Sequence, residues 1–283
     1  MSTDRLEILV TLDQKYLPPL RVMLASLYLN NPGTACRVHL LHRSLPESEL
    51  QSLRQNLEGI GYSLSPVPVD GRLFEGAPVS EQYPQEMYYR LLAGHLLPPE
   101  IGRVLYLDPD LLVINPVREL WELDLGGRVF AAAAHTRKTE LANSVNKLRL
   151  RTETRYFNSG VLLIDLRRAR EAVDPEALFA YVKERASRLL LPDQDLLNAL
   201  YGREIRELDD YRWNYDARNY SGYFLRSSGK ATVDWVMQHT AILHFCGRTK
   251  PWTPLYRHRF GILYKHYQQI ARRLFAGGRA ADD

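Results

Sequence analysis

Short apolar runs alternate with helical segments over residues 6–117, and this alternation constrains the fold more than any other feature of the sequence. Runs rich in branched apolar side chains predict strands over 6–12, 36–43, 62–70 and 103–117. Segments with helical spacing separate these runs, over 17–30, 46–61 and 84–98. This order of elements predicts an α/β fold with a mainly parallel sheet and helices on both faces.

The second half of the chain shows a more mixed pattern. Strands are predicted over 128–135, 156–166, 203–208 and 241–247, and helices over 174–189 and 193–202. Residues 216–232 are rich in Tyr, Gly and Ser and predict an irregular excursion. Because no change in composition marks a linker, we expect one continuous domain over 1–254, followed by a tail over 255–283.

Composition excludes several classes of protein. The chain has 283 residues, of which 45% are hydrophobic and 25% charged, as in soluble globular proteins. A net charge of +4 without a clustered basic patch does not indicate a nucleic-acid partner. Cys36 and Cys246 are far apart, so neither a disulfide framework nor a zinc knuckle is expected. The pattern of a signal peptide and the apolar window of a spanning helix are both absent, which favours a cytoplasmic protein.

Two carboxylates end the fourth predicted strand. Asp108 and Asp110 flank Pro109 within the apolar run RVLYLDPDLLVINPV. Ligands of open α/β sheets bind beyond the carboxyl ends of the strands, and an unpaired buried carboxylate is costly. Two such acids can hold a divalent cation and leave coordination positions for the phosphates of a ligand. The sequence contains neither of the glycine-rich phosphate loops GxGxxG and GxxxxGK[ST], so a metal or side chains would hold any phosphate.

An isolated pair of acids also occurs in two other structural contexts. One is a turn acid beside a helix-capping acid, because Asp is a common turn residue. Another is the nucleophile motif of haloacid-dehalogenase-type phosphatases. That motif continues with glycine and threonine, whereas this sequence continues with DLLVINP and lies behind several predicted elements.

Three further polar groups occur at the ends of predicted elements. They are Asn158 in front of a strand, Asp193 and Gln194 at a helix start, and His244 at the end of a strand, with Gly247 and Lys250 following it. A histidine is a suitable third ligand for Mn²⁺, and a lysine can contact a phosphate as a point charge. Each group alone also fits a structural role, as a strand histidine, a helix cap or a turn.

Six sequence blocks together resemble the pattern of glycosyltransferase family 8, which includes bacterial lipooligosaccharide galactosyl- and glucosyltransferases and glycogenin. The blocks lie in one order between residues 6 and 252: LVTLDQKY, YYRLLAG, VLYLDPDLLV, YFNSGVLLIDL, PDQDLLN and LHFCGRTKPW. The resemblance implies the GT-A fold, a single mixed α/β domain that binds a UDP-sugar with Mn²⁺, or with Mg²⁺ in its place.

The resemblance also implies roles for individual residues. The metal ligands would be Asp108, Asp110 and His244. Contacts with the nucleoside, ribose and diphosphate would come from Thr11, Leu12, Asp13, Tyr16, Arg90, Pro109, Gly247 and Lys250. The transferred sugar would be surrounded by Asn158, Asp193 and Gln194. Two residues depart from the family pattern. Pro109 lacks the N–H that relatives can offer to the ribose, and His135 occupies a region where several relatives carry an acid.

The activity implied by the resemblance is retaining transfer of glucose or galactose from a UDP-sugar to a hydroxyl of a saccharide or glycolipid. A double displacement would require a carboxylate on the β-face of the sugar. The matching residue is the amide Gln194, so front-face attack by the acceptor and a covalent intermediate are both open. Two other interpretations are a metal-dependent nucleotide-sugar hydrolase and a non-catalytic nucleotide-sugar-binding protein. The acids, His244 and Lys250 argue against the latter.

Residues 256–275 predict a basic amphipathic helix without an acidic residue. Its apolar stripe comprises Tyr256, Phe260, Leu263, Tyr264, Tyr267, Ile270 and Leu274. Its basic residues are Arg257, Arg259, Lys265, Arg272 and Arg273. One interpretation is a last helix that packs its stripe on the domain. The other is a helix that lies on the inner face of an anionic membrane, as a peripheral contact close to a lipid-linked acceptor.

Overall fold

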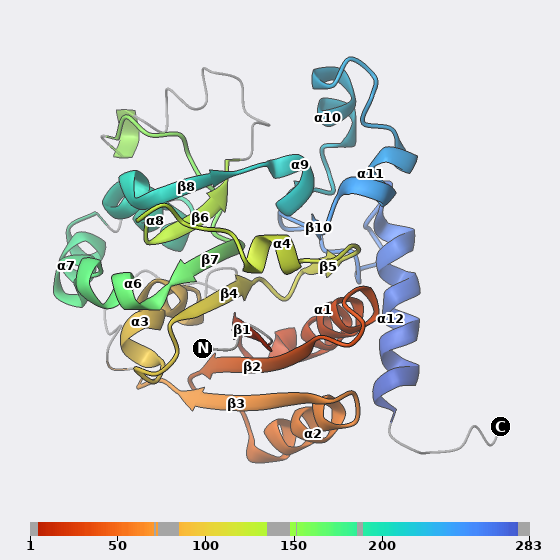
Figure 1. The fold of residues 1–283 in the computed structure, drawn as a ribbon, viewed down its shortest axis with the longest axis horizontal. Coiled ribbons are helices and arrows are strands. Elements are labelled where there is room, and N and C mark those ends of the chain that lie inside the picture. Colours follow the sequence, from red (N-terminus) through yellow and green to blue (C-terminus); the bar gives the residue numbers. More distant parts are fainter. Residues whose placement is uncertain are drawn as a thin grey trace.

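One mixed sheet of seven strands forms the centre of the protein. The computed structural model describes residues 5–70, 72, 85–134, 148–150, 152–185 and 189–276. The strand order is β3-β2-β1-β4-β7-β6-β8 (Figure 1). The strands are β1 (Arg5–Thr11), β2 (Ala35–His42), β3 (Tyr62–Pro68), β4 (Arg103–Leu107), β6 (Phe130–Ala133), β7 (Val161–Asp165) and β8 (Ile205–Leu208). All neighbouring pairs are parallel except the two that involve β7, which confirms the predicted mainly parallel sheet.

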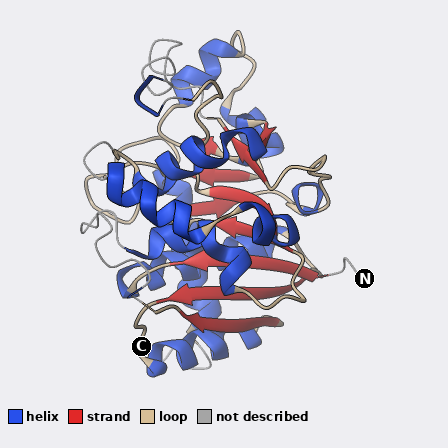
Figure 2. Cartoon of the chain, turned by 90° about the vertical axis from the view of Figure 1, so that its left-hand side faces the viewer, coloured by secondary structure: helices blue, strands red, loops and turns tan. Residues whose placement is uncertain are grey.

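Helices cover both faces of this sheet (Figure 2). Because successive strand residues point to opposite faces, Ile8 and Val10 join one apolar core and Leu9 joins the other. The first core is closed by α1 (Leu17–Asn30) and α2 (Glu47–Glu58). The second is closed by η3 (Gln85–Leu92), α3 (Ala93–Leu96), α6 (Leu166–Ala172), α7 (Pro175–Arg185) and α8 (Pro192–Tyr201).

A second, three-stranded sheet lies beside the large one and was not predicted. Its strands are β5 (Leu111–Val113), β10 (Ile242–His244) and β9 (Tyr215–Asp216), with β10 in the middle. The predicted strand over 103–117 therefore divides into β4 and β5, which belong to different sheets. The division falls at Pro109, which has no N–H to donate to a sheet. The turn that carries Asp108 and Asp110 thus lies where the two sheets meet.

The remaining short elements lie between the strands and the longer helices. They are η1 (Gln14–Tyr16), α4 (Arg118–Trp121), η5 (Gly202–Glu204), α9 (Asp210–Trp213), α10 (Tyr220–Arg226) and α11 (Val233–His239). The expected irregular excursion over 216–232 is wrong in part, because it contains α10. Within α10, Tyr223 is buried, and its ring stacks on that of Tyr215 with centroids 3.9 Å apart.

The helix expected over 84–98 is also different from the prediction. Residues 85–92 form a 3₁₀-helix, and only the four residues of α3 are α-helical. All eight side chains of η3 are buried, including Arg90. The segment is therefore packed on every side and has no exposed polar face, in contrast to an amphipathic helix. It also forms the tighter turn of a 3₁₀-helix. Residues 186–188 of the helix predicted over 174–189, and His135 of the strand predicted over 128–135, lie outside the described residues.

The C-terminal helix α12 (Gly261–Phe275) lies alongside α1 (Figure 1). Tyr256, Phe260 and Tyr264 of its predicted stripe are buried, and they share a core with residues of α1 and the small sheet. Lys265, Arg272 and Arg273 are exposed. The stripe therefore packs on the domain, as the first interpretation expected. Among the described residues, no helix has the length and hydrophobicity needed to cross a membrane.

Candidate metal and donor site

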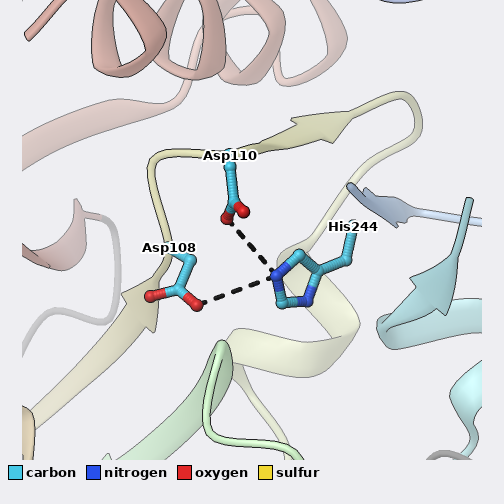
Figure 3. Close-up of side chains that lie close together, drawn as sticks. All are labelled: Asp108, Asp110 and His244. Carbon is cyan, nitrogen blue, oxygen red and sulfur yellow. Dashed lines mark ion pairs between the residues drawn. The ribbon is translucent and has the colours of Figure 1, made fainter. Parts of the chain in front are cut away.

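Asp108, Asp110 and His244 form a cluster with the ligand types of a metal site (Figure 3). One potential ligand atom from each lies within 4.8 Å of the others. His244 Nε2 lies 3.3 Å from Asp110 Oδ1 and 3.7 Å from Asp108 Oδ2. The acids follow β4, and His244 ends β10, which pairs with β5 directly after the acids. The cluster thus forms because the chain changes sheets at Pro109.

Gly160 leaves space beside this cluster. A Cβ at this position would overlap the imidazole of His244 and lie 2.6 Å from Asp108 Oδ2. The carbonyl of Gly160 also accepts a hydrogen bond of 2.9 Å from the backbone N–H of Asp108. The backbone therefore approaches the side chains of His244 and Asp108 more closely than any other residue type would allow.

Lys250 contributes a positive charge to the same site. Its ammonium donates to a carboxylate oxygen of Asp110 and to the carbonyl of Phe245 at 3.2 Å. Burial alone would raise the pKa of the Asp110 carboxyl, but Lys250 and His244 hold that pKa well below its usual range. Burial also disfavours the imidazolium, yet Cys246 and Asp110 raise the pKa of His244 well above its ordinary value.

Arg90 joins the metal cluster to the start of α8. Its Nη1 lies 2.9 Å from Asp108 Oδ1 and 3.3 Å from Asp193 Oδ2, and it donates to the carbonyl of Ser159 at 3.1 Å. Burial opposes the guanidinium charge, but Asp108 and Asp193 raise the pKa of Arg90 above its ordinary value. Burial raises the pKa of the Asp193 carboxyl, although Arg90 and the Ser159 hydroxyl oppose that shift. Arg90 therefore orients an acid on each side of it.

The three residues assigned to the sugar lie together. Asn158 Nδ2 donates to Gln194 Oε1 at 3.0 Å, and the Ser159 hydroxyl donates to Asp193 Oδ2 at 2.7 Å. In both bonds, one residue comes from the turn before β7 and the other from the first turn of α8, which begins with Pro192. Asp193 and Gln194 are largely buried. The two segments thus place a row of polar side chains next to the metal cluster.

The residues assigned to the nucleoside lie at the end of β1 and in the turn after it. Thr11 and Leu12 are buried, and Asp13 caps η1 by accepting from the N–H of Lys15 at 2.9 Å. Tyr16 meets Trp252 edge-on, with ring centroids 5.9 Å apart. Burial raises the pKa of the Tyr16 phenol, and the nearby Lys250 opposes that shift. This stretch therefore borders the site from the side of β1.

Gly247 adopts a backbone conformation that favours glycine. Its φ is +90°, and a Cβ would overlap the guanidinium of Arg218. Arg218 is in turn held by two hydrogen bonds to the buried Asp216, at 2.9 and 2.8 Å. The loop between His244 and Lys250 is therefore packed closely against the residues that follow β9.

Asn214 is the main site residue that sequence reasoning missed. It is fully buried between α9 and β9, and it contacts His244 Nδ1 and Asn158 Oδ1, both at 2.9 Å. No local signal marks it, because its partners belong to distant parts of the chain. Tyr106 was also missed, although its phenol donates to Asp108 at 2.5 Å and lies 3.3 Å from Thr11 Oγ1. Its place on β4, two residues before Asp108, was the available signal.

The sequence is similar to those of several known proteins. The model of the family described as Glycosyl transferase family 8 matches residues 7–255. The chain is 28% identical to General stress protein A of Bacillus subtilis over 269 residues, which cover 92% of each protein. It is 24% identical to the lipopolysaccharide 1,2-glucosyltransferase of Escherichia coli K12 over 255 residues, covering 89% of this chain and 74% of the relative.

A solved structure extends the similarity to three dimensions. The galactosyltransferase LgtC, in complex with donor and acceptor sugar analogs, superimposes with a TM-score of 0.79 at 25% identity. The match covers 94% of this chain and 96% of LgtC. The fold is therefore the GT-A fold of LgtC. Because the family match spans the metal cluster, the start of α8 and both sheets, the chain belongs to glycosyl transferase family 8.

Proposed function

We propose that the protein transfers glucose or galactose from a UDP-sugar to a hydroxyl of a saccharide or glycolipid, with retention of configuration and with Mn²⁺ as the metal. The cluster of Asp108, Asp110 and His244, with Lys250 beside it, is the observation that carries the proposal. The names of the relatives support the hexose class, because one is a glucosyltransferase and another a galactosyltransferase.

The residues present fit a divalent cation. Two carboxylates and one imidazole are ligands that Mn²⁺ accepts. Mg²⁺ is the alternative metal, although it prefers oxygen ligands. The missing side chain at Gly160 keeps the space beside His244 and Asp108 open. When bound, the cation would act as a Lewis acid that stabilises the negative charge of the departing UDP.

The chain's own residues would orient the donor beside the metal cluster. The ammonium of Lys250 would contact the diphosphate as a point charge, and Gly247 would allow its backbone to approach. Arg90 would contact the donor, and Asn158 and Asp193 would hold the transferred sugar. Thr11, Leu12, Asp13 and Tyr16 would hold the uracil at the end of β1, and Pro109 would lie near the ribose without an N–H to offer.

Front-face attack is the reaction course that the contacts of Gln194 favour. Its Oε1 already accepts from Asn158, and an amide is a poor nucleophile. The acceptor hydroxyl would therefore form its bond to the anomeric carbon on the face from which UDP leaves. The bond between that carbon and the β-phosphate oxygen breaks, and the hydroxyl proton passes to the departing phosphate. Asp193 would hold the sugar hydroxyls and would not attack.

The tail after residue 254 would serve a separate purpose. We propose that residues 1–254 form the transferase domain and that residues 255–283 form a tail. The exposed basic residues of its helix, within 256–275, would contact the inner face of an anionic membrane. Lys265, Arg272 and Arg273 are exposed on α12, while the apolar stripe packs on the domain. The contact would be peripheral and electrostatic, and it would keep a cytoplasmic enzyme close to a lipid-linked acceptor.

A donor screen followed by product analysis tests the activity. UDP-sugars are compared by thermal shift in the presence of Mn²⁺, and the best donor is incubated with and without saccharide acceptors. A transferase forms a glycosylated product and releases UDP faster when the acceptor is present. Release of UDP that no acceptor changes would indicate a hydrolase. Binding without any release of UDP would indicate a non-catalytic protein.

A further inference from the structure

A series of hydrogen bonds connects the metal cluster with Gln194. His244 Nδ1 pairs with Asn214 Oδ1 at 2.9 Å, and Asn214 Nδ2 donates to Asn158 Oδ1 at 2.9 Å. Asn158 Nδ2 then donates to Gln194 Oε1 at 3.0 Å. Asn214 is fully buried, and His244 and Gln194 are nearly so. Four side chains from four separate segments are thus joined in one line.

The backbone N–H of Gly160 determines the direction of every bond in this series. It donates to Asn158 Oδ1 at 2.9 Å, and a backbone N–H can only donate. Asn158 must therefore direct its Nδ2 toward Gln194, which must accept with Oε1. The group of Asn214 that faces Asn158 Oδ1 must be its Nδ2, so its Oδ1 faces His244. His244 must then donate from Nδ1.

The two ends of the series have consequences for the chemistry. At one end, donation from Nδ1 leaves Nε2 as the imidazole nitrogen that faces Asp108 and Asp110 and can bind a metal. At the other end, Oε1 of Gln194 accepts a hydrogen bond from Asn158. This bond occupies the oxygen that would otherwise have to act as the nucleophile. The orientation of a metal ligand and that of an amide beside the sugar therefore depend on the same residue.

We propose that Asn214 is a positioning residue that couples metal binding at His244 to the orientation of the Gln194 amide, an inference that rests on the proposed transferase function. Asn214 suits this task because its amide offers one acceptor and one donor in opposite directions. A carboxylate in its place offers only acceptors, and an alkyl side chain offers neither.

Two variants separate the two bonds of Asn214. In Asn214→Asp, the bond from His244 Nδ1 is kept, while two oxygens face each other at Asn158. Titration with Mn²⁺ alone should show unchanged metal affinity, and kcat for transfer should fall about 10- to 100-fold with little change in KM. In Asn214→Leu, both bonds are lost, so Mn²⁺ affinity should also fall about 10- to 100-fold.

Asn198→Ala is the matched control. Asn198 is equally buried and makes three hydrogen bonds, two with the backbone of Phe157 and one with the carbonyl of Gln194. Its removal should lower the melting temperature and leave Mn²⁺ affinity unchanged. Equal loss of Mn²⁺ affinity in Asn198→Ala and Asn214→Leu would reduce Asn214 to a structural role. Equal loss of Mn²⁺ affinity in Asn214→Asp and Asn214→Leu would also reduce Asn214 to a structural role.

The wild-type protein distinguishes failure of this inference from failure of the proposed function. A wild-type chain that binds no Mn²⁺ and transfers no sugar would overturn the proposed function. A wild-type chain that binds Mn²⁺ and transfers sugar, beside an Asn214→Leu variant with the same Mn²⁺ affinity and kcat, would overturn only the role of Asn214.

Discussion

Lys250 donates to the carboxylate of Asp110, although 140 positions separate the two residues. Burial lowers the pKa of Lys250, but the Asp110 carboxylate more than offsets this effect, so the ammonium is retained. The positive charge that the buried acid requires is thus supplied by the residue proposed to contact the diphosphate. A divalent cation at Asp110 would supply the same neutralisation and would leave Lys250 available to the donor.

Replacing Lys250 by Met should therefore make stability depend on the metal. Removing one partner of a buried ion pair costs about 3–5 kcal/mol, and this is an upper bound here because Lys250 is partly exposed. The melting temperature of Lys250→Met should fall without Mn²⁺ and rise more on adding Mn²⁺ than that of the wild type. The exposed Lys183→Met is the control. An equal Mn²⁺ response in all three proteins would contradict this role for the pair.

Turnover should fall more than nucleoside affinity in the same Lys250 variant. The charge of Lys250 matters most as the diphosphate departs, and the uracil contacts lie elsewhere. Steady-state kinetics with the best UDP-sugar and calorimetry with uridine provide the two measurements. Equal losses in kcat and in uridine affinity would mean that Lys250 only supports the structure.

Removing a metal ligand should remove metal-dependent UDP binding. Asp110→Ala deletes a carboxylate and should abolish the Mn²⁺-dependent part of UDP affinity in calorimetry. His244→Ala should weaken it, because the two acids remain. Unchanged Mn²⁺-dependent affinity in Asp110→Ala would refute the assignment of the metal site. UDP titrations with chelator provide the metal-free reference for each protein.

Gly160→Ala tests whether the space beside the cluster is required. The added Cβ would overlap His244 and lie 2.6 Å from Asp108 Oδ2, so the metal ligands must move. Mn²⁺ affinity should fall about 10-fold or more. Gly59→Ala is a matched control, since its nearest contact is an ordinary 3.4 Å with the carbonyl of Gln55. Normal Mn²⁺ affinity in Gly160→Ala would show that the ligands do not need this space.

Gln194 variants distinguish the two reaction courses. Under front-face attack, Gln194→Ala should retain measurable transfer, because no bond forms to the amide. Gln194→Glu should show no glycosyl adduct by intact mass spectrometry after incubation with the donor. Complete loss of transfer in Gln194→Ala together with an adduct in Gln194→Glu would favour a covalent intermediate instead.

Neutralising the exposed basic residues of α12 tests membrane contact without disturbing the core. The triple variant Lys265→Gln, Arg272→Gln and Arg273→Gln should float less with anionic vesicles, since each basic residue contributes about 1 kcal/mol. Wild-type flotation should fall as salt is raised. The control neutralises the exposed Arg118, Lys183 and Arg203 on other elements. A wild-type chain that never floats would refute the membrane role.

Local patterns predicted most elements of the large sheet. The alternation of apolar side chains along 6–12 and the helical spacing over 17–30 are properties of neighbouring residues, and the structure places β1 and α1 there. The acids after β4 were found for the same reason, because an apolar run that ends in two carboxylates is visible in the sequence. The blocks shared with the family then indicated which distant residues belong with them.

The structure alone shows how the site is joined. Asn214 has no local signal for its partners, and the pairing of Lys250 with Asp110 depends on β10 lying beside β5. The sequence by itself determined the strands of the large sheet, the longest helices and the chemical types of the ligands, because these follow from short-range periodicity and composition. Tertiary structure decided which nitrogen of His244 faces the acids and which atom of Gln194 is held. Those choices are made by hydrogen bonds between segments that meet only when both sheets have formed.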